Sequence, residues 1–98
     1  MSLKSTLIGQ KVIARSRNAG VHIGTLDAKD GQEVRLTDAK RLWYWKGAFT
    51  LSQVAETGVK KGSKVGCPVP VVELSEVCEV LPITDTAFSS LEHYIERA

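Results

Sequence analysis

The chain has 98 residues, of which 43% are hydrophobic and 24% are charged, a composition typical of a globular protein. This length excludes a doubly wound cofactor-binding fold and a (β/α)8 barrel, so we expect one domain over residues 1–98. The longest apolar candidate, Pro68–Leu74, is far shorter than the roughly 20 residues of a membrane-spanning helix, and we expect no membrane partner.

The net charge of +2 conceals an uneven distribution along the chain. Residues 1–66 carry twelve Lys and Arg against five Asp and Glu, a net charge of +7, whereas residues 67–98 carry one Arg against six acids, a net charge of −5. This asymmetry predicts a dipolar molecule whose basic face attracts phosphates or docks on the acidic face of another copy. We therefore expect a homo-oligomer.

The N-terminal part of the chain is predicted to form an antiparallel pair of strands. Lys11–Arg15 is a strand-like run, and Asn18–Gly20 is a turn in which glycine tolerates a positive φ. Val21–Leu26 alternates with the period of a half-exposed strand, which places His22 on the solvent side.

Turn chemistry then predicts a hairpin. Asp30–Gly31 favours a primed turn, and the alternation in Glu33–Thr37 indicates a strand that pairs back antiparallel. A further, separate strand is expected over Arg41–Lys46, after Asp38–Ala39.

A short middle helix follows. Thr50–Gln53 has the Thr-x-x-Gln pattern of a capping box, and Gly58 suits the left-handed position that ends a helix. The next segment, Val59–Gly66, contains three lysines and two glycines and is predicted to be a mobile loop.

The last third is predicted to contain an edge strand or two and a final helix. Val69–Leu81 indicates one or two strands interrupted near Ser75, with Cys78 packed inside, and the preceding prolines place their start at a sheet edge. After Pro82, Thr84 or Asp85 is expected to cap a helix that carries Phe88, Leu91 and Ile95. The fold class is therefore α+β, an antiparallel sheet of about five or six strands with a short middle helix and a C-terminal helix.

Both tryptophans lie in the segment Arg41–Lys46, between two cations. On a strand, Arg41, Trp43 and Trp45 project from one face. One interpretation is that this face belongs to the core and each indole N–H finds a backbone acceptor. The other is that one or more of the rings stack on a planar ligand, with the guanidinium adding a cation–π contact.

Two basic clusters are candidates for binding phosphate. Backbone amides between the glycines of Gly58–Gly66 favour an anion-binding concavity beside Lys60, Lys61 and Lys64, although the spacing fails the Walker pattern and a solvated linker is the alternative. Arg15 and Arg17 form the second cluster, and Arg suits bidentate phosphate recognition.

The sequence gives little support for catalysis. His22 and His93 have no fixed spacing to a nucleophile, and Cys67 and Cys78 lack the spacing of a zinc half-site. We expect no enzyme, no cofactor and no metal site.

The segment Ala39–Gln53, which reads AKRLWYWKGAFTLSQ, resembles a family of small proteins of tailed bacteriophages and prophages that share a domain of unknown function. The resemblance extends upstream through Ala19–Leu26 and onward to Gly58. It implies a phage accessory protein in the host cytoplasm, a context in which small proteins often antagonise host defence, and it carries no catalytic residues.

These observations lead to one functional expectation and two alternatives. The expectation is a non-enzymatic, oligomeric binding module that captures a nucleotide-like or phosphate-bearing ligand through Arg41, Trp43 and Trp45, helped by the basic clusters. The first alternative is an antagonist that binds a host protein, or a virion component, with the aromatics as core or interface anchors. The second is a nucleic-acid-binding protein, which the acidic second half disfavours because it repels an extended backbone.

Overall fold

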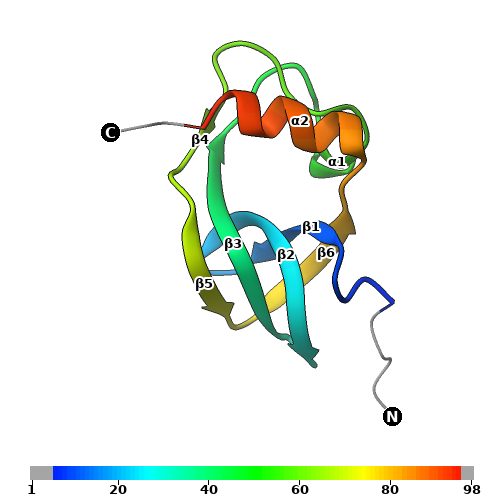
Figure 1. Ribbon diagram of the computed structural model, residues 1–98, viewed down its shortest axis with the longest axis vertical. Coiled ribbons are helices and arrows are strands. Elements are labelled where there is room, and N and C mark those ends of the chain that lie inside the picture. The colour runs from blue at the N-terminus through cyan, green and yellow to red at the C-terminus, as the bar shows by residue number, and fades with distance from the viewer. Residues whose placement is uncertain (1–5, 96–98) are drawn as a thin grey trace.

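The computed structural model describes residues 6–95 and has the α+β architecture predicted from the sequence (Figure 1). It contains six antiparallel strands, a short middle helix and a C-terminal helix. In chain order the elements are β1 (Lys11–Ser16), β2 (Gly20–Asp30), β3 (Glu33–Tyr44), α1 (Leu51–Thr57), β4 (Lys64–Val65), β5 (Val69–Leu74), β6 (Val77–Pro82) and α2 (Asp85–His93).

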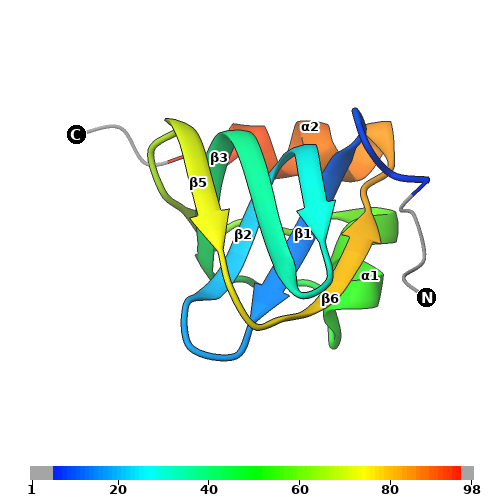
Figure 2. The ribbon, with the colours of Figure 1, turned by 90° about the horizontal axis from the view of Figure 1, so that it is seen from below.

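The sheet is curled, because its two end strands are also neighbours in the chain. The five longer strands have the order β5-β3-β2-β1-β6, and β4 pairs with the C-terminal end of β3. In a flat sheet the two end strands would lie about 19 Å apart. Only Ser75 and Glu76 join β5 to β6, a link that spans about 11 Å at most. The sheet therefore bends until β5 approaches β6, and Figure 2 shows the short connection between them.

Apolar side chains fill two layers, one on each face of this sheet. The concave face encloses the first, and helices α1 and α2 cover the second (Figure 1). Neighbouring residues of β1 alternate between them, since Val12 belongs to the first layer and Ile13 to the second. Burial on both faces explains why β1 is a continuous apolar run rather than an alternating one.

Strand β3 is a single element, whereas the sequence predicted separate strands over Glu33–Thr37 and Arg41–Lys46. Pairing with β2 shifts by one residue between Thr37 and Lys40, and Asp38 takes a left-handed φ of +49° in this bulge. Gly24 of β2 lies opposite, where an added Cβ would be 3.0 Å from the Thr37 carbonyl oxygen. The bulge bends β3 without ending it, and the strand stops at Tyr44 rather than Lys46.

The predicted hairpin joins β2 to β3, with a small shift in its turn. The two connecting residues are Gly31 and Gln32, and Gly31 has a φ of +59°. At the other end of the sheet, β5 pairs with β3 alone and is an edge strand, as its prolines predicted. Cys78, by contrast, is exposed on β6 rather than packed in the core.

Capping residues fix the two helices where the sequence placed them. Thr50 Oγ1 accepts a hydrogen bond from the Gln53 backbone N–H, and Gln53 Oε1 accepts one from the backbone N–H of Phe49. Gly58 ends α1 at a φ of +83°. Thr84 is the N-cap of α2, which ends at His93, so Ile95 lies beyond the helix and bridges to Val65.

The segment Val59–Gly66 is not the mobile loop that its lysines and glycines predicted. Within it, Val59, Ser63 and Val65 are buried. The Ser63 hydroxyl accepts a hydrogen bond from the Lys46 backbone N–H and donates one to the Lys60 carbonyl. The three lysines lie outward while the valines enter the helix-covered layer, so the segment is fixed along β3.

Replacing Thr84 with alanine is expected to lower the free energy of unfolding by about 1 to 2 kcal/mol. The Thr84 hydroxyl accepts a hydrogen bond from the Ala87 N–H and donates one to the Glu56 carbonyl, so it both caps α2 and ties it to α1. Chemical denaturation measures the loss. Thr84→Ser keeps the hydroxyl and should remain close to the wild type; an equal loss in both variants would contradict this role.

Candidate functional site

A hollow of about 370 Å³ opens where the turn between β1 and β2 meets the C-terminal end of β3. Its volume lies at the lower end of the range of small-molecule sites. The residues that line it come from these two segments: Asn18, Ala19, Gly20, Val21, Arg41, Leu42, Trp43 and Trp45. The structure thus brings Arg41, Trp43 and Trp45 around one cavity, which we call the tryptophan hollow.

Arg41 is held against the turn on one side of this hollow. Its Nη2 donates a 2.6 Å hydrogen bond to the Ala19 carbonyl oxygen. The next residue, Gly20, has a φ of +82°, and a Cβ there would lie 3.9 Å from two of the guanidinium nitrogens. A fixed guanidinium at a cavity wall presents its remaining N–H groups and its flat face with little loss of side-chain entropy on binding.

The two indoles occupy different environments. Trp43 is 52% exposed on β3, and its surface is available to a ligand. Trp45 is half-buried and packs against the apolar layer under the helices. The expectation that both rings share one strand face with Arg41 is therefore wrong for Trp45, because β3 ends at Tyr44 and the chain turns toward the helices.

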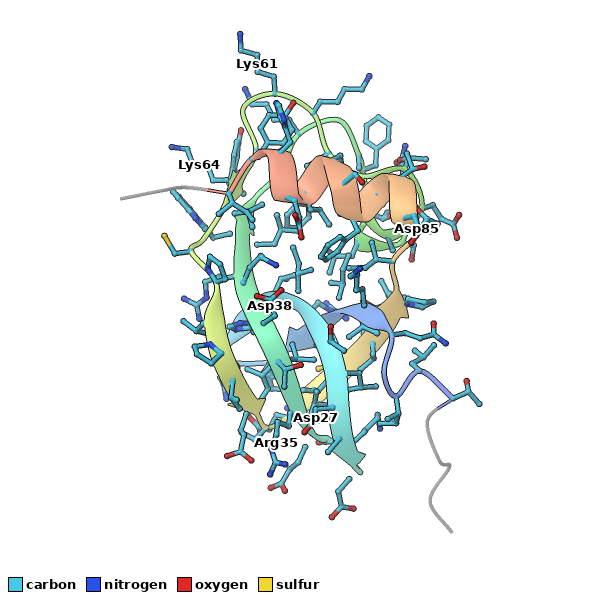
Figure 3. The ribbon with its side chains drawn as sticks, viewed as in Figure 1. Asp27, Arg35, Asp38, Lys61, Lys64 and Asp85 are labelled. Atoms are coloured by element: carbon cyan, nitrogen blue, oxygen red, sulfur yellow. The ribbon has the colours of Figure 1, made fainter. Side chains whose placement is uncertain are left out.

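The segment Val59–Gly66, which we call the lysine segment, lies beside the tryptophan hollow. Strand β4 pairs with β3 at Leu42 and Tyr44, and this pairing brings Lys64 Nζ to 5.2 Å from the centre of the Trp43 ring. Lys60 and Lys61 are exposed on the preceding turn. Figure 3 shows Lys61 and Lys64 at one end of the molecule, with Asp27 and Arg35 at the other.

The second basic cluster lies outside the cavity lining. Arg15 Nε lies 3.4 Å from Glu79 Oε1, and Arg17 is an exposed residue next to Asn18. Asn18 Nδ2 in turn donates a 2.6 Å hydrogen bond to Glu76 Oε2. Glu79 of β6 therefore pairs with Arg15, and Glu76, in the turn before β6, binds Asn18 next to Arg17.

His22 is buried, with 8% of its surface exposed, and does not face solvent as the alternation predicted. His22 pairs with Ala14, which belongs to the layer that the concave face encloses, so this side of β2 does not face solvent. His22 Nε2 lies 2.9 Å from the Ala19 carbonyl oxygen, the same atom that binds Arg41. The histidine therefore supports the wall of the tryptophan hollow from beneath.

Acidification is expected to destabilise the protein through His22. Burial lowers the pKa of His22 below its usual 6.5, and the charge of Arg41 lowers it further, against the opposing effect of the hydrogen bond to Ala19. The unfolded chain then binds this proton more readily, so the free energy of unfolding falls as the pH decreases below 6.5. Urea denaturation at about pH 7.5 and about pH 5.5 measures the change. His22→Gln should lose less stability over this interval; an identical loss would assign it to other groups.

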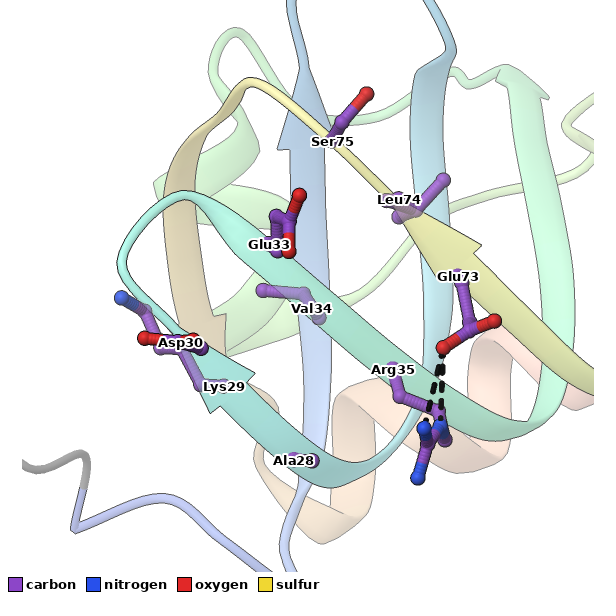
Figure 4. Close-up of a pocket in the computed structure, with 9 residues that line it drawn as sticks. All are labelled: Ala28, Lys29, Asp30, Glu33, Val34, Arg35, Glu73, Leu74 and Ser75. Atoms are coloured by element: carbon purple, nitrogen blue, oxygen red, sulfur yellow. Dashed lines mark hydrogen bonds and ion pairs between the residues drawn. The ribbon is translucent and has the colours of Figure 1, made fainter.

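A second hollow, of about 390 Å³, lies at the far end of the molecule between the β2–β3 hairpin and β5 (Figure 4). The sequence gave no signal for it, because its residues come from distant segments. Arg35 lines it and is bound to Glu73 at 3.2 Å and to Asp27 at 3.5 Å. The hydrogen bond to Glu73, reinforced by Asp27, raises the pKa of Arg35. Because Arg35 is already paired with these two carboxylates, this second hollow is less suited to binding an anion than the tryptophan hollow.

Across residues 6–95, the structure contains no group of three or more histidine, cysteine or acidic side chains arranged to hold a metal ion. Among the same residues, no helix has the length and apolar character needed to cross a membrane.

Fold and cavity define a small α+β protein with an aromatic, cationic hollow at one end of its sheet. The chain belongs to the family described as Domain of unknown function (DUF6948), whose model matches residues 9–91. No curated protein matches it. A chain in the crystal structure of the NatC complex bound to CoA is similar, with a TM-score of 0.48 and 16% sequence identity over 93% of this chain and 99% of that chain. A likeness of that size carries no argument about function.

Proposed function

We propose that the protein is a non-enzymatic binding module that captures a nucleotide-like ligand in the tryptophan hollow. In this proposal the base stacks on Trp43 and is contacted by Arg41, which lies two positions earlier on the same strand. Trp45 also lines the hollow and packs against the helix-covered layer. The context is that of a small phage-type accessory protein acting in the host cytoplasm, where sequestering a nucleotide would antagonise host defence.

The observation that carries the proposal is the pairing of an exposed indole with an immobilised guanidinium. Trp43 is 52% exposed although a ring of this size usually buries most of its surface. Arg41 is tied to Ala19 at 2.6 Å and lines the same cavity. A base–aromatic stack contributes about 1 to 3 kcal/mol, and a neighbouring guanidinium adds a cation–π contact.

Titration with nucleotides tests this function directly. The four common ribonucleoside 5′-monophosphates are added separately, and the quenching of tryptophan fluorescence is followed. Saturable quenching by at least one of them, reproduced by calorimetry, supports the proposal. Protein purified from infected cells is denatured in parallel, and any released small molecule is identified by mass spectrometry. No saturable binding and no released nucleotide would overturn it.

We also propose self-association, which the exposed apolar side chains support. Phe49, in the connection between β3 and α1, is 95% exposed, and Val69 and Val71 of the edge strand β5 are 43% and 52% exposed. Exposed residues of this kind mark protein interfaces when they gather on one surface. Light scattering coupled to size exclusion gives the mass; a monomer at all concentrations would favour the alternative in which these residues bind a host protein.

A further inference from the structure

The two flanks of the tryptophan hollow differ in the carboxylates that lie near their cations. On one side lies the turn between β1 and β2, with the connection from β5 to β6 behind it. On the other side lies the lysine segment, which includes β4. Both flanks contain cations that the sequence offered as phosphate ligands, and the structure distinguishes between them.

On the turn side, carboxylates accompany the cations. Glu79 lies 3.4 Å from Arg15, and Glu76 accepts a 2.6 Å hydrogen bond from Asn18, which itself lines the hollow. The carbonyl oxygen of Glu76 also accepts a hydrogen bond from the Arg17 backbone N–H. A phosphate placed here would meet two carboxylates as well as two guanidinium groups, so this flank has no net positive charge to attract it.

On the lysine side, Lys46, Lys60 and Lys61 gather on two adjacent segments. Lys60 N–H donates to the Lys46 carbonyl at 2.9 Å, and the aliphatic chain of Lys46 passes over Gly62, so the two segments lie side by side. Among the described residues, no carboxylate lies within 4.0 Å of the ammonium groups of Lys46, Lys60 or Lys61. This flank is a region of positive potential next to the hollow.

Lys64 connects this region to the stacking surface. Its Nζ lies 5.2 Å from the centre of the Trp43 ring, and the Gly66 N–H binds the Arg41 carbonyl oxygen at 2.8 Å, which fixes β4 beside the cavity wall. A ligand whose base stacks on Trp43 can therefore direct its phosphate toward Lys64.

We infer that the ligand of the tryptophan hollow is a phosphorylated nucleotide whose phosphate groups extend over Lys64 toward Lys60 and Lys61, and not toward Arg15 and Arg17. This inference rests on the proposed function and adds the direction and the chemical class of the ligand. Arg41 and Trp43 then recognise the base, and the lysine segment recognises the phosphate chain.

A series of ligands that differ only in phosphate number tests the direction. The four common ribonucleosides and their 5′-mono- and 5′-triphosphates are titrated into the wild type by calorimetry. Affinity is expected to rise from nucleoside to triphosphate and this rise to diminish with added salt, because the lysines are exposed. Lys64→Ala should weaken triphosphate binding about fivefold more than it weakens nucleoside binding, the upper range for one exposed ion pair.

Three variants complete the experiment. Lys60→Ala/Lys61→Ala should reduce the same phosphate-dependent gain, whereas Arg17→Ala should leave it intact. Lys29→Ala removes an exposed lysine at the opposite end of the molecule and controls for net charge. Thermal unfolding verifies that each variant is folded.

Different results would contradict the proposed direction of the phosphates and the proposed nucleotide-binding function. If nucleosides bind as tightly as triphosphates, or if Arg17→Ala rather than Lys64→Ala removes the gain, the direction is wrong while the site stands. If none of the ligands binds the folded wild type, the proposed function fails, and the inference fails with it.

Discussion

Trp43→Ala is expected to weaken nucleotide binding about 5- to 150-fold, the range that corresponds to one lost base–aromatic stack. The protein should still unfold close to the wild-type temperature, because half of the Trp43 ring is already exposed to water. Isothermal calorimetry with the tightest-binding nucleotide of the series, together with thermal unfolding of the same sample, measures both quantities.

Trp45→Ala is the matched comparison within the same hollow. Trp45 is half-buried against the layer under the helices, so its removal should cost about 2 to 3 kcal/mol of folding free energy, below the value for a fully buried ring. Nucleotide binding should decrease only to the extent that the hollow loses the part of its lining that Trp45 forms. If both variants are equally destabilised and Trp43→Phe fails to restore binding, the indole of Trp43 belongs to the core and the stacking proposal is wrong.

Signals that act over a few residues were enough to predict one hairpin and the starts of both helices. Asp30–Gly31 marks a turn, and the pattern of Thr50–Gln53 and the hydroxyl of Thr84 mark helix starts, because each satisfies backbone groups within its own segment. The structure confirms all three, and with them the α+β class.

Features that depend on distant pairing were not predictable. The left-handed Asp38 is tolerated because Gly24, fourteen positions earlier, leaves room for β3 to bend. Val59–Gly66 looks like solvated linker by composition, yet its position is fixed by hydrogen bonds to Arg41 on β3 and to Lys46, which follows β3. Composition shows which residues of such a segment are polar, but it does not show the hydrogen-bond partners that fix their position.

The candidate site shows the same division. The aromatic and cationic residues around Arg41 and Trp43 predicted a binding site, and the structure places these two residues beside a cavity. Their binding role remains a prediction. The contact that fixes Arg41, its hydrogen bond to Ala19, spans 22 positions and has no sequence signal. The burial of His22 was missed for the related reason that its side of β2 is enclosed when the sheet curls, which depends on pairing between distant strands.

Gly58→Ala is expected to be the most destabilising single methyl addition, at about 3 to 5 kcal/mol. Gly58 has φ +83° and ψ −156°, a region that is essentially restricted to glycine. An added Cβ would overlap Ser90 Oγ and would lie 3.1 Å from the Cα of Ala87, so α1 and α2 would have to separate. Ser90 yields poorly, because its hydroxyl accepts a hydrogen bond from the Val59 N–H and donates one to the Ala87 carbonyl.

Gly31→Ala provides the control for the conformational part of this loss. Gly31 also has a positive φ, +59°, but a Cβ there would meet nothing within 4 Å, so the cost should be about 1 kcal/mol. Urea denaturation of the two variants separates backbone strain from the collision between the helices. Because Gly58 joins α1 to the lysine segment, loosening this contact should also weaken the phosphate-dependent part of nucleotide binding. Equal losses of stability in the two variants would mean that α1 and α2 are not in the close contact on which the helix-covered layer depends.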